Sequence, residues 1–168
     1  MKKDFSKIKL FAMDVDGTLT DGKIYIGNDG EVMKAFNAKD GLGIKLLIKK
    51  GIIPIIITGR RSKIVTRRCE EIGITVLYQG VRDKADILKT VMAKYDCTPE
   101  QTVYIGDDMN DLSAMQTAGI TFAPADCAAA LLPYVDFVLT QKSGDAPVRE
   151  AIDIILENRL TLSDYESI

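Results

Sequence analysis

Short apolar runs alternate along the chain with longer segments in which apolar residues recur at helical spacing. The short runs are rich in β-branched residues and predict strands. Several are apolar at every position, which is typical of parallel strands covered by helices on both faces. Strands are expected at residues 8–15, 52–58, 75–78, 102–105, 120–123 and 137–139.

The segments between these strands predict helices, many of which open with Ser, Asp or Pro at capping positions. They are expected at residues 41–50, 62–72, 84–95, 110–118, 128–132 and 147–158. The alternation predicts an α/β fold with a doubly wound parallel sheet. The 168 residues are enough for one domain over 1–168, with a mobile polar tail at 159–168.

One segment departs from this alternation. Lys23-Ile24-Tyr25-Ile26 and Glu31-Val32-Met33-Lys34 flank the turn cluster Gly27-Asn28-Asp29-Gly30. This pattern predicts a β-hairpin over 21–36. Because the hairpin directly follows the acidic end of the first strand, we expect it to form a flap over a site.

Composition narrows the possible functions. The 22 Lys and Arg residues nearly balance the 24 Asp and Glu residues, and no basic tract occurs, so neither nucleic acid nor an anionic membrane is expected as a partner. No apolar run approaches bilayer length, and the amino terminus lacks the apolar core of an export signal. Three cysteines without a CxxC pair indicate reduced thiols and a cytoplasmic protein.

The chain contains no histidine. This excludes a Ser-His-Asp or Cys-His relay and a His-ligated zinc site. Acid-base chemistry near neutral pH is therefore left to carboxylates, Lys, Tyr or Cys.

Polar residues gather at the carboxyl ends of the predicted strands, where ligands bind in open α/β sheets. The first strand ends in Asp14-Val15-Asp16-Gly17-Thr18, and the second ends in Thr58-Gly59-Arg60. A later strand leads into Gly106-Asp107-Asp108-Met109-Asn110-Asp111, and Lys84 begins the helix after the third strand. These carboxylates, the hydroxyl and the ammonium predict a phosphoryl-transfer site.

The chemistry explains why two carboxylates stand one residue apart. The Asp14 carboxylate can attack phosphorus, provided that a divalent cation and an ammonium neutralise the charge repulsion with an anionic substrate. Oxygen ligands without His or paired Cys favour Mg²⁺. Asp16, on the same side of an extended chain, can protonate the leaving alkoxide and then accept a proton from water. For this it must begin protonated, which partial burial and an ionised Asp14 favour.

Each signal also has a plainer interpretation. A lone Asp-x-Asp-Gly stretch is more often an acidic turn, Thr58 could merely cap a helix, and Lys84 could be solvated. Their order along the chain favours the catalytic interpretation. A phosphoacceptor receiver domain is the alternative from another class, but its acceptor Asp lies on the third strand, and here that strand ends in Tyr78-Gln79-Gly80.

The four motifs, in this order, resemble those of haloacid dehalogenase (HAD) superfamily phosphatases over nearly the whole chain. The resemblance implies a HAD-like, Rossmannoid fold in which Asp14 is the nucleophile and Asp16 the general acid and base. It implies that Thr58 and Lys84 hold phosphoryl oxygens. It also implies that Mg²⁺ binds Asp14, Asp107 and the Asp16 main-chain carbonyl, with Asp111 and Asp108 supporting the metal shell.

The intervals between the motifs have no room for a cap domain, so we expect an open site and a homo-oligomer in which a neighbouring subunit covers it. The chain resembles the capless 3-deoxy-D-manno-octulosonate 8-phosphate (KDO 8-phosphate) phosphatases, which implies a tetramer and a role in lipopolysaccharide precursor synthesis. The resemblance is carried by Asp21-Gly22-Lys23-Ile24-Tyr25, Lys34-Ala35-Phe36-Asn37, Asp40-Gly41-Leu42-Gly43, Thr58-Gly59-Arg60-Arg61, Arg67-Arg68-Cys69, Leu77-Tyr78-Gln79-Gly80 and Val148-Arg149-Glu150.

A sugar-acid phosphate carries a carboxylate, for which guanidinium groups are suitable partners. Gly59, Arg60 and Arg68 are therefore expected to bind substrate together with Asp16, Thr58 and Lys84. The chain departs from the family at Ser143-Gly144-Asp145-Ala146-Pro147, where Gly-Gly-x-Gly-Ala is usual, and at Thr18 and Thr20. These departures leave open a nonulosonate (sialic-type acid) 9-phosphate or a broader range of sugar phosphates.

Overall fold

The computed structural model describes residues 3–166, so the last two residues of the expected tail, Ser167 and Ile168, lie outside the described residues. Within this range one parallel sheet has the strand order β5-β4-β1-β6-β7-β8. Its strands are β1 (Leu10–Met13), β4 (Ile53–Thr58), β5 (Val76–Gln79), β6 (Thr102–Ile105), β7 (Ile120–Ala123) and β8 (Phe137–Val138). All six lie within or next to the predicted ranges.

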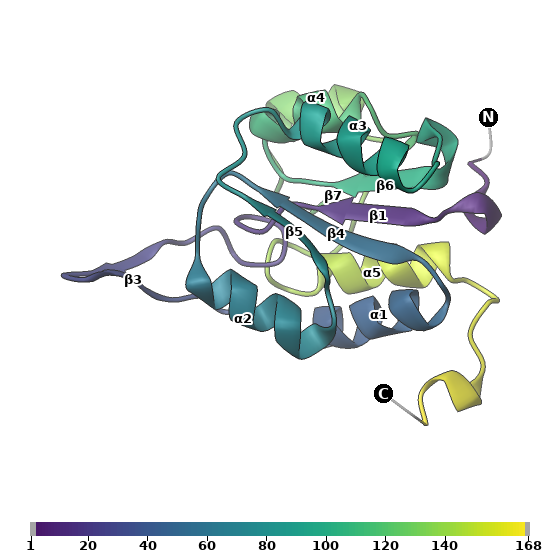
Figure 1. Cartoon of the computed structure of the whole chain (residues 1–168), viewed down its shortest axis with the longest axis horizontal. Helices are drawn as coiled ribbons and strands as arrows, with labels where there is room; N and C mark the ends of the chain where they lie inside the picture. Colours follow the sequence, from purple (N-terminus) through teal and green to yellow (C-terminus); the bar gives the residue numbers. More distant parts are fainter. Residues whose placement is uncertain (1–2, 167–168) are drawn as a thin grey trace.

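Helices cover both faces of this sheet, as Figure 1 shows. On one face lie α1 (Ala38–Lys49), α2 (Lys63–Ile72) and α5 (Pro147–Ile155), and on the other lie α3 (Lys84–Lys94) and α4 (Leu112–Met115). Alternate residues of β1 enter the two hydrophobic cores: Phe11 and Met13 pack in one, Leu10 and Ala12 in the other, and all four are fully buried. This two-sided burial is the reason for the apolar runs, and the predicted doubly wound sheet is confirmed.

Helix ends follow local capping chemistry. The side chains of Asn37, Ser62 and Asp83 accept backbone N–H bonds at the starts of α1, α2 and α3. The predicted helix at 41–50 begins earlier, at Ala38, because Asn37 caps it.

Two of the predicted α-helices are wholly or partly 3₁₀ helix in the structure. Residues 110–118 hold the 3₁₀ turn η3 (Met109–Asp111) and the single-turn α4, and residues 128–132 belong to the 3₁₀ helix η4 (Ala129–Tyr134). Pro133 lies inside η4 and has no N–H for an α-helical hydrogen bond. Further 3₁₀ turns are η1 (Phe5–Lys7), η2 (Pro99–Gln101) and η5 (Leu162–Asp164).

The hairpin consists of β2 (Tyr25–Gly27) and β3 (Gly30–Met33), which pair antiparallel through a turn at Asn28-Asp29. It projects away from the sheet (Figure 1), and its strands are mostly exposed. Between β1 and β4 the described chain contains only this hairpin and α1, so no separate cap domain is present there.

The described part of the tail is held by hydrogen bonds. Asp164 accepts the N–H of Thr161 at 2.8 Å and pairs with Lys50 at 2.8 Å, close to the end of α1. These contacts hold residues 161–164 beside the end of α1, and the mobility of the tail stays a prediction. In Figure 1 this end of the chain lies on the side opposite to the hairpin. Within residues 3–166, no helix has the length and apolar character needed to cross a membrane.

Candidate active site

The carboxyl ends of three neighbouring strands form the candidate site. Asp14 follows the last residue of β1, and its N–H donates to the carbonyl of Ile105 in β6 at 3.1 Å. Thr58 is the last residue of β4, on the other side of β1, and it is buried. Because β1 lies between β4 and β6, segments far apart in sequence meet at this edge.

A buried lysine joins two carboxylates there. Lys84, the first residue of α3, donates from Nζ to Asp14 Oδ1 at 2.7 Å and to Asp111 Oδ1 at 2.6 Å. The three side chains are at most 4% exposed. Burial alone lowers the pKa of Lys84, but the two carboxylates outweigh it and raise that pKa above its ordinary value. Lys84 is therefore a buried ammonium held in a fixed position.

Asp111 orients the groups around it. Besides Lys84, its Oδ1 accepts the hydroxyl of Tyr104 at 2.8 Å, and its Oδ2 accepts the backbone N–H of Asp107 at 3.1 Å. Burial and the charge of Asp111 raise the pKa of Tyr104, so this phenol remains a donor. Asp111 thus fixes the lysine and the start of the loop after β6.

Carboxylate oxygens of Asp14, Asp107 and Asp111 lie within 4.8 Å of one another. Burial and repulsion by Asp111 raise the pKa of Asp14 to about 6, and burial and repulsion by Asp14 raise the pKa of Asp107 to about 7. A cation between them would favour their charged forms. This oxygen-only set fits a hard divalent cation.

Asp16 lies beside two cations. Lys34, which directly follows β3 of the hairpin, donates to Asp16 Oδ1, and its side chain is 1% exposed. The Nε of Arg60 lies 3.8 Å from Asp16 Oδ2, and the Arg60 side chain is about half exposed. The loop that carries Asp16 is fixed by Thr20, whose buried hydroxyl accepts the N–H of Gly17 at 3.4 Å.

The remaining predicted residues divide into two groups. Gly59 and Arg60 follow Thr58 at the same edge, as expected. Asp108 is exposed, and its side chain accepts the N–H of Met109 at 2.7 Å. It therefore caps η3 rather than joining the acidic cluster that was expected to include it.

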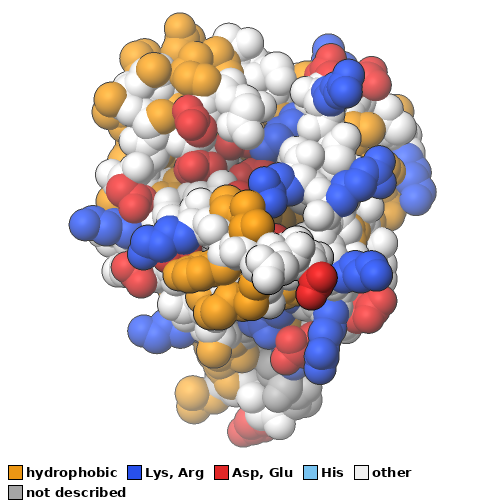
Figure 2. All heavy atoms as spheres, turned by 90° about the vertical axis from the view of Figure 1, so that its left-hand side faces the viewer, with side chains coloured by type: hydrophobic (Ala, Val, Ile, Leu, Met, Phe, Trp, Pro, Cys, Tyr) orange, Lys and Arg blue, Asp and Glu red, His pale blue; other side chains and the backbone are white. Residues whose placement is uncertain are grey.

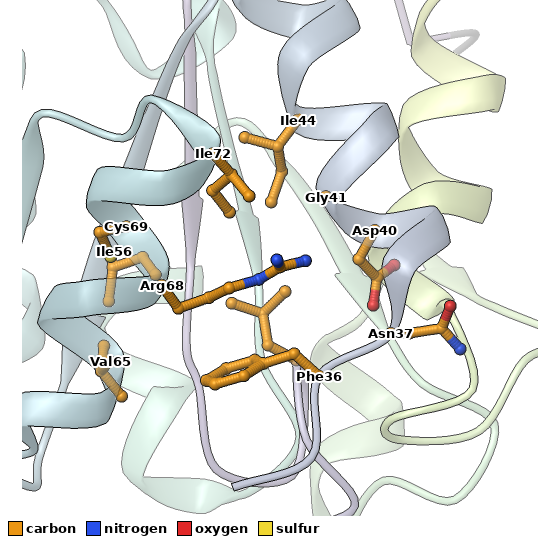
Figure 3. A pocket seen from close by; sticks show the side chains of 11 residues that line it. Phe36, Asn37, Asp40, Gly41, Ile44, Ile56, Val65, Arg68, Cys69 and Ile72 are labelled. Carbon is orange, nitrogen blue, oxygen red and sulfur yellow. The ribbon is translucent and has the colours of Figure 1, made fainter.

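Arg68 also lies elsewhere. It extends from the middle of α2 toward α1, into a pocket that includes Phe36 and Asp40 (Figure 3). Its guanidinium pairs with Glu71 at 3.0 Å and lies 5.8 Å from the centre of the Phe36 ring. The structure therefore does not bring Arg68 to the active-site carboxylates of its own chain.

Two residues of the site were missed as functional groups in the sequence. Tyr104 looked like one more apolar position of its strand, and nothing in the pattern marked its hydroxyl. Lys34 carried a signal, because an antiparallel hairpin that pairs Tyr25 with Met33 returns the chain to the loop that it left. This pairing sets Lys34 beside residue 24, and its contact with Asp16 depends on how the hairpin folds onto the loop after β1.

Comparisons with known proteins agree with this geometry. The model of the haloacid dehalogenase-like hydrolases matches residues 73–152. The chain is 46% identical over 151 residues to the 3-deoxy-D-manno-octulosonate 8-phosphate phosphatase of Yersinia pestis, covering 90% of this chain and 81% of that protein.

Two solved structures extend the comparison. The cobalt-bound deoxy-D-mannose-octulosonate 8-phosphate phosphatase of Haemophilus influenzae aligns with a TM-score of 0.91 at 36% identity, covering 96% of this chain and 98% of that one. The Moraxella catarrhalis 3-deoxy-D-manno-octulosonate 8-phosphate phosphatase, in complex with magnesium, phosphate and KDO, aligns with a TM-score of 0.88 at 40% identity, covering 91% and 88%.

Proposed function

The chain belongs to the haloacid dehalogenase-like hydrolases, in the family of 3-deoxy-D-manno-octulosonate 8-phosphate phosphatases, and from this membership we propose that it hydrolyses KDO 8-phosphate to KDO and phosphate. The observation that carries the proposal is the buried Asp14–Lys84–Asp111 arrangement at the carboxyl end of β1, with Asp107 beside it. A buried carboxylate paired with an ammonium and facing a cation-binding cluster suits attack on a phosphate ester.

In the first step, an oxygen of Asp14 attacks phosphorus, and the bond between phosphorus and the sugar oxygen breaks. Asp16 gives its proton to that oxygen, which leaves as the hydroxyl of KDO. Lys84 holds Asp14 in position and lowers the repulsion between its carboxylate and the phosphate dianion. The hydroxyl of Thr58 at the end of β4 holds a phosphoryl oxygen.

In the second step, a water oxygen attacks the phosphorus of the aspartyl phosphate, and the bond between phosphorus and Asp14 breaks. Asp16, now deprotonated, takes the proton of this water. Phosphate leaves, and both carboxyl groups return to their starting states. The same two residues therefore serve both half-reactions.

Mg²⁺ is the cation we propose for the acidic cluster, held by Asp14, Asp107 and the main-chain carbonyl of Asp16. Bound there, it would supply positive charge to the phosphoryl oxygens. Asp111 contributes indirectly, because both of its oxygens already accept hydrogen bonds from Lys84, Tyr104 and the loop after β6.

Arg60 is the candidate partner for the carboxylate of the sugar acid. It follows the catalytic strand β4, and its half-exposed side chain can reach a ligand beside Asp16. Arg68, which packs between α1 and α2 with its side chain 19% exposed, can serve this purpose only toward a site other than that of its own chain or after it leaves its pocket. A nonulosonate 9-phosphate has the same carboxylate, but the relatives favour KDO 8-phosphate over it.

We propose a tetramer in the cytoplasm. The hairpin exposes large apolar side chains, with Ile26 71% and Val32 61% exposed. Figure 2 looks at the end from which the hairpin projects and shows hydrophobic side chains gathered in the middle of that face, with acidic side chains deeper above them. An apolar patch beside an open site suits a surface that a neighbouring subunit covers.

A substrate panel tests this function. Initial rates are measured with Mg²⁺ on KDO 8-phosphate, a nonulosonate 9-phosphate and hexose phosphates. The proposal expects the highest kcat/KM for KDO 8-phosphate. Equal values for hexose phosphates, which lack the carboxylate, would remove the proposed role of Arg60, and an absence of phosphate release from all of them would overturn the function.

A further inference from the structure

Lys34 is the most enclosed cation of the hairpin. Its side chain is 1% exposed, and its ammonium contacts Asp16 Oδ1 and lies 3.0 Å from Glu31 Oε1. Desolvation of an ammonium is costly unless carboxylates surround it. Glu31 provides that compensation throughout, and Asp16 adds to it when it is ionised after the first proton transfer, so charge determines the position of this lysine.

Glu31 is itself fixed from the other side. Its Oε2 accepts the hydroxyl of Ser62, the N-cap residue of α2. The backbone N–H of Ser62 in turn donates to the side chain of Gln79, at the end of β5, at 2.6 Å. A continuous path of hydrogen bonds and an ion pair therefore runs from the sheet edge through the start of α2 to the hairpin and ends on Asp16.

This path repeats the arrangement around the nucleophile. Lys84 joins Asp14 to Asp111, and Lys34 joins Asp16 to Glu31. We propose that Lys34 is a positioning residue for Asp16, and that Glu31 and Ser62 fix Lys34 from the hairpin and from α2. The inference rests on the proposed function, because it assigns Lys34 to the proton-transfer group of that reaction.

Lys34 does not have the properties of a substrate ligand. A ligand must reach a molecule in the open site, whereas this side chain is enclosed and its ammonium is already held by two carboxylates. Arg60 differs in both respects, because it is about half exposed and its Nε lies 3.8 Å from Asp16. Arg60 is therefore available to substrate, whereas Lys34 is held within the chain by Asp16 and Glu31.

The flap thus supplies part of the catalytic machinery of its own chain. Glu31 lies opposite Ile26 near the turn, Lys34 directly follows the end of β3, and the two form an ion pair, while the large apolar side chains Ile26 and Val32 are exposed. A covering surface alone would need no enclosed ion pair. Lys34 and Glu31 orient the proton-transfer group, and the exposed apolar side chains remain free for contact with another subunit.

The test compares Lys34→Met and Lys34→Arg with Lys23→Met. Lys23 is the matched control because it lies on the same hairpin, is 72% exposed at its side chain and pairs with Asp21 instead. Each variant is rapidly mixed with 4-nitrophenyl phosphate, whose leaving group departs as a stable anion and needs no proton from Asp16. Steady-state kcat and KM are then measured on KDO 8-phosphate.

With 4-nitrophenyl phosphate, Lys34→Met is expected to release about one equivalent of nitrophenolate in a burst. Its later steady turnover should be at least roughly tenfold slower than that of the parent, because hydrolysis of the aspartyl phosphate still needs an oriented base. On KDO 8-phosphate, kcat should fall at least about tenfold while KM stays within about twofold. Lys34→Arg should restore part of kcat, and Lys23→Met should match the parent.

Other outcomes overturn the inference. If Lys34 has only a structural role, burst amplitude and steady rate will fall together in proportion to the folded fraction, which melting curves measure. An unchanged kcat in Lys34→Met also rejects it. If the parent is active on 4-nitrophenyl phosphate and inactive on KDO 8-phosphate, the proposed substrate fails while the burst still decides the role of Lys34. A parent inactive on both rejects both.

Discussion

Gly17 lies so close to Asp107 that a β-carbon at position 17 would overlap the Asp107 carboxylate. Gly17 also has a φ of +95°, a region that residues with a β-carbon rarely adopt. The glycine of the first acidic motif therefore has a specific physical purpose. It lets the loop after β1 approach the carboxylate at the end of β6.

We expect Gly17→Ala to lower phosphatase activity by roughly 100-fold, because it displaces Asp107 from the acidic cluster. Gly51→Ala is the matched control, since Gly51 has a φ of +76° and no atom within 4 Å of an added β-carbon. Both variants carry backbone strain, but only the β-carbon added at position 17 contacts the active site. Similar activity losses in the two would show that strain, rather than the contact with Asp107, is responsible. The measurement is kcat at saturating Mg²⁺.

Asp14→Asn should reduce turnover to below about one-hundredth of the parent, because an amide cannot form the acyl phosphate. The variant should also fail to retain labelled phosphate after acid quenching. Asp108→Asn is the control of the same chemical kind, because Asp108 is exposed and caps η3. It should keep activity within about threefold, and a large loss there would place Asp108 in the site after all.

The sequence predicted most of the fold because the relevant signals are local. Strands that are buried on both faces must be apolar at every position, and caps such as Asn37 and Ser62 mark helix starts. The predictions failed where a short polar network decides the local structure. At η3, Asp108 and Asp111 bond to nearby backbone N–H groups and hold the chain in a 3₁₀ turn before α4 begins.

Strand-end reasoning placed Asp14, Thr58 and Asp107 together because parallel topology forces their strands to share an edge. It could not supply Lys34, whose role depends on how the hairpin folds back onto the loop after β1. It also could not show that Arg68 faces α1. The helical pattern of α2 indicates which side of the helix is buried, but it does not indicate which element packs against that side. The pattern of apolar and polar positions does not predict contacts between elements that are distant in sequence.

Mg²⁺ should raise the melting temperature of the parent. A ligand that binds only the folded state at a hundredfold excess over its Kd contributes about 2.7 kcal/mol. That is roughly 5–10 °C for a domain of this size. Asp107→Asn removes one of the cluster's carboxylates and should abolish most of this shift, whereas a chelator should return the parent to its metal-free melting temperature. An equal shift in parent and variant would contradict the proposed ligand set.

Asp40 should make stability depend on pH. It is 2% exposed, its Oδ1 accepts the N–H of Arg149 at 2.7 Å, and its Oδ2 has no hydrogen-bond partner. Burial raises its pKa to about 7, despite the Arg149 hydrogen bond and the nearby charge of Arg68. The folded state thus keeps the proton to higher pH than the unfolded chain, whose carboxyl titrates near the ordinary aspartate pKa of 3.8.

The sign follows from proton binding. The contribution of Asp40 to stability is fully present below about pH 4 and is lost as pH rises to about 7, by an amount on the order of 4 kcal/mol. Asp40→Asn should flatten this part of the stability curve in urea unfolding measured from pH 4 to 8. Asp153→Asn, at an exposed carboxylate that pairs with Arg149, should leave the slope unchanged. A parent curve parallel to that of Asp40→Asn would refute the assignment.

The hairpin should control the oligomeric state. Ile26→Lys and Val32→Lys together place two charges on its most exposed apolar positions. Charges in the centre of a subunit interface are costly to bury, so the double variant should elute as a smaller species in light-scattering chromatography. Leu162→Lys, which alters an 85% exposed leucine in the tail, is the control and should keep the parent's mass.

The activity of the smaller species separates the two roles of the flap. Ile26 and Val32 are exposed, whereas Lys34 and Glu31 are held by ion pairs within the chain. Dissociation should therefore leave turnover of 4-nitrophenyl phosphate nearly intact. It should raise KM for KDO 8-phosphate, since a neighbouring subunit would no longer cover the sugar. A smaller species with the parent's KM for KDO 8-phosphate would show that each chain recognises the sugar acid alone.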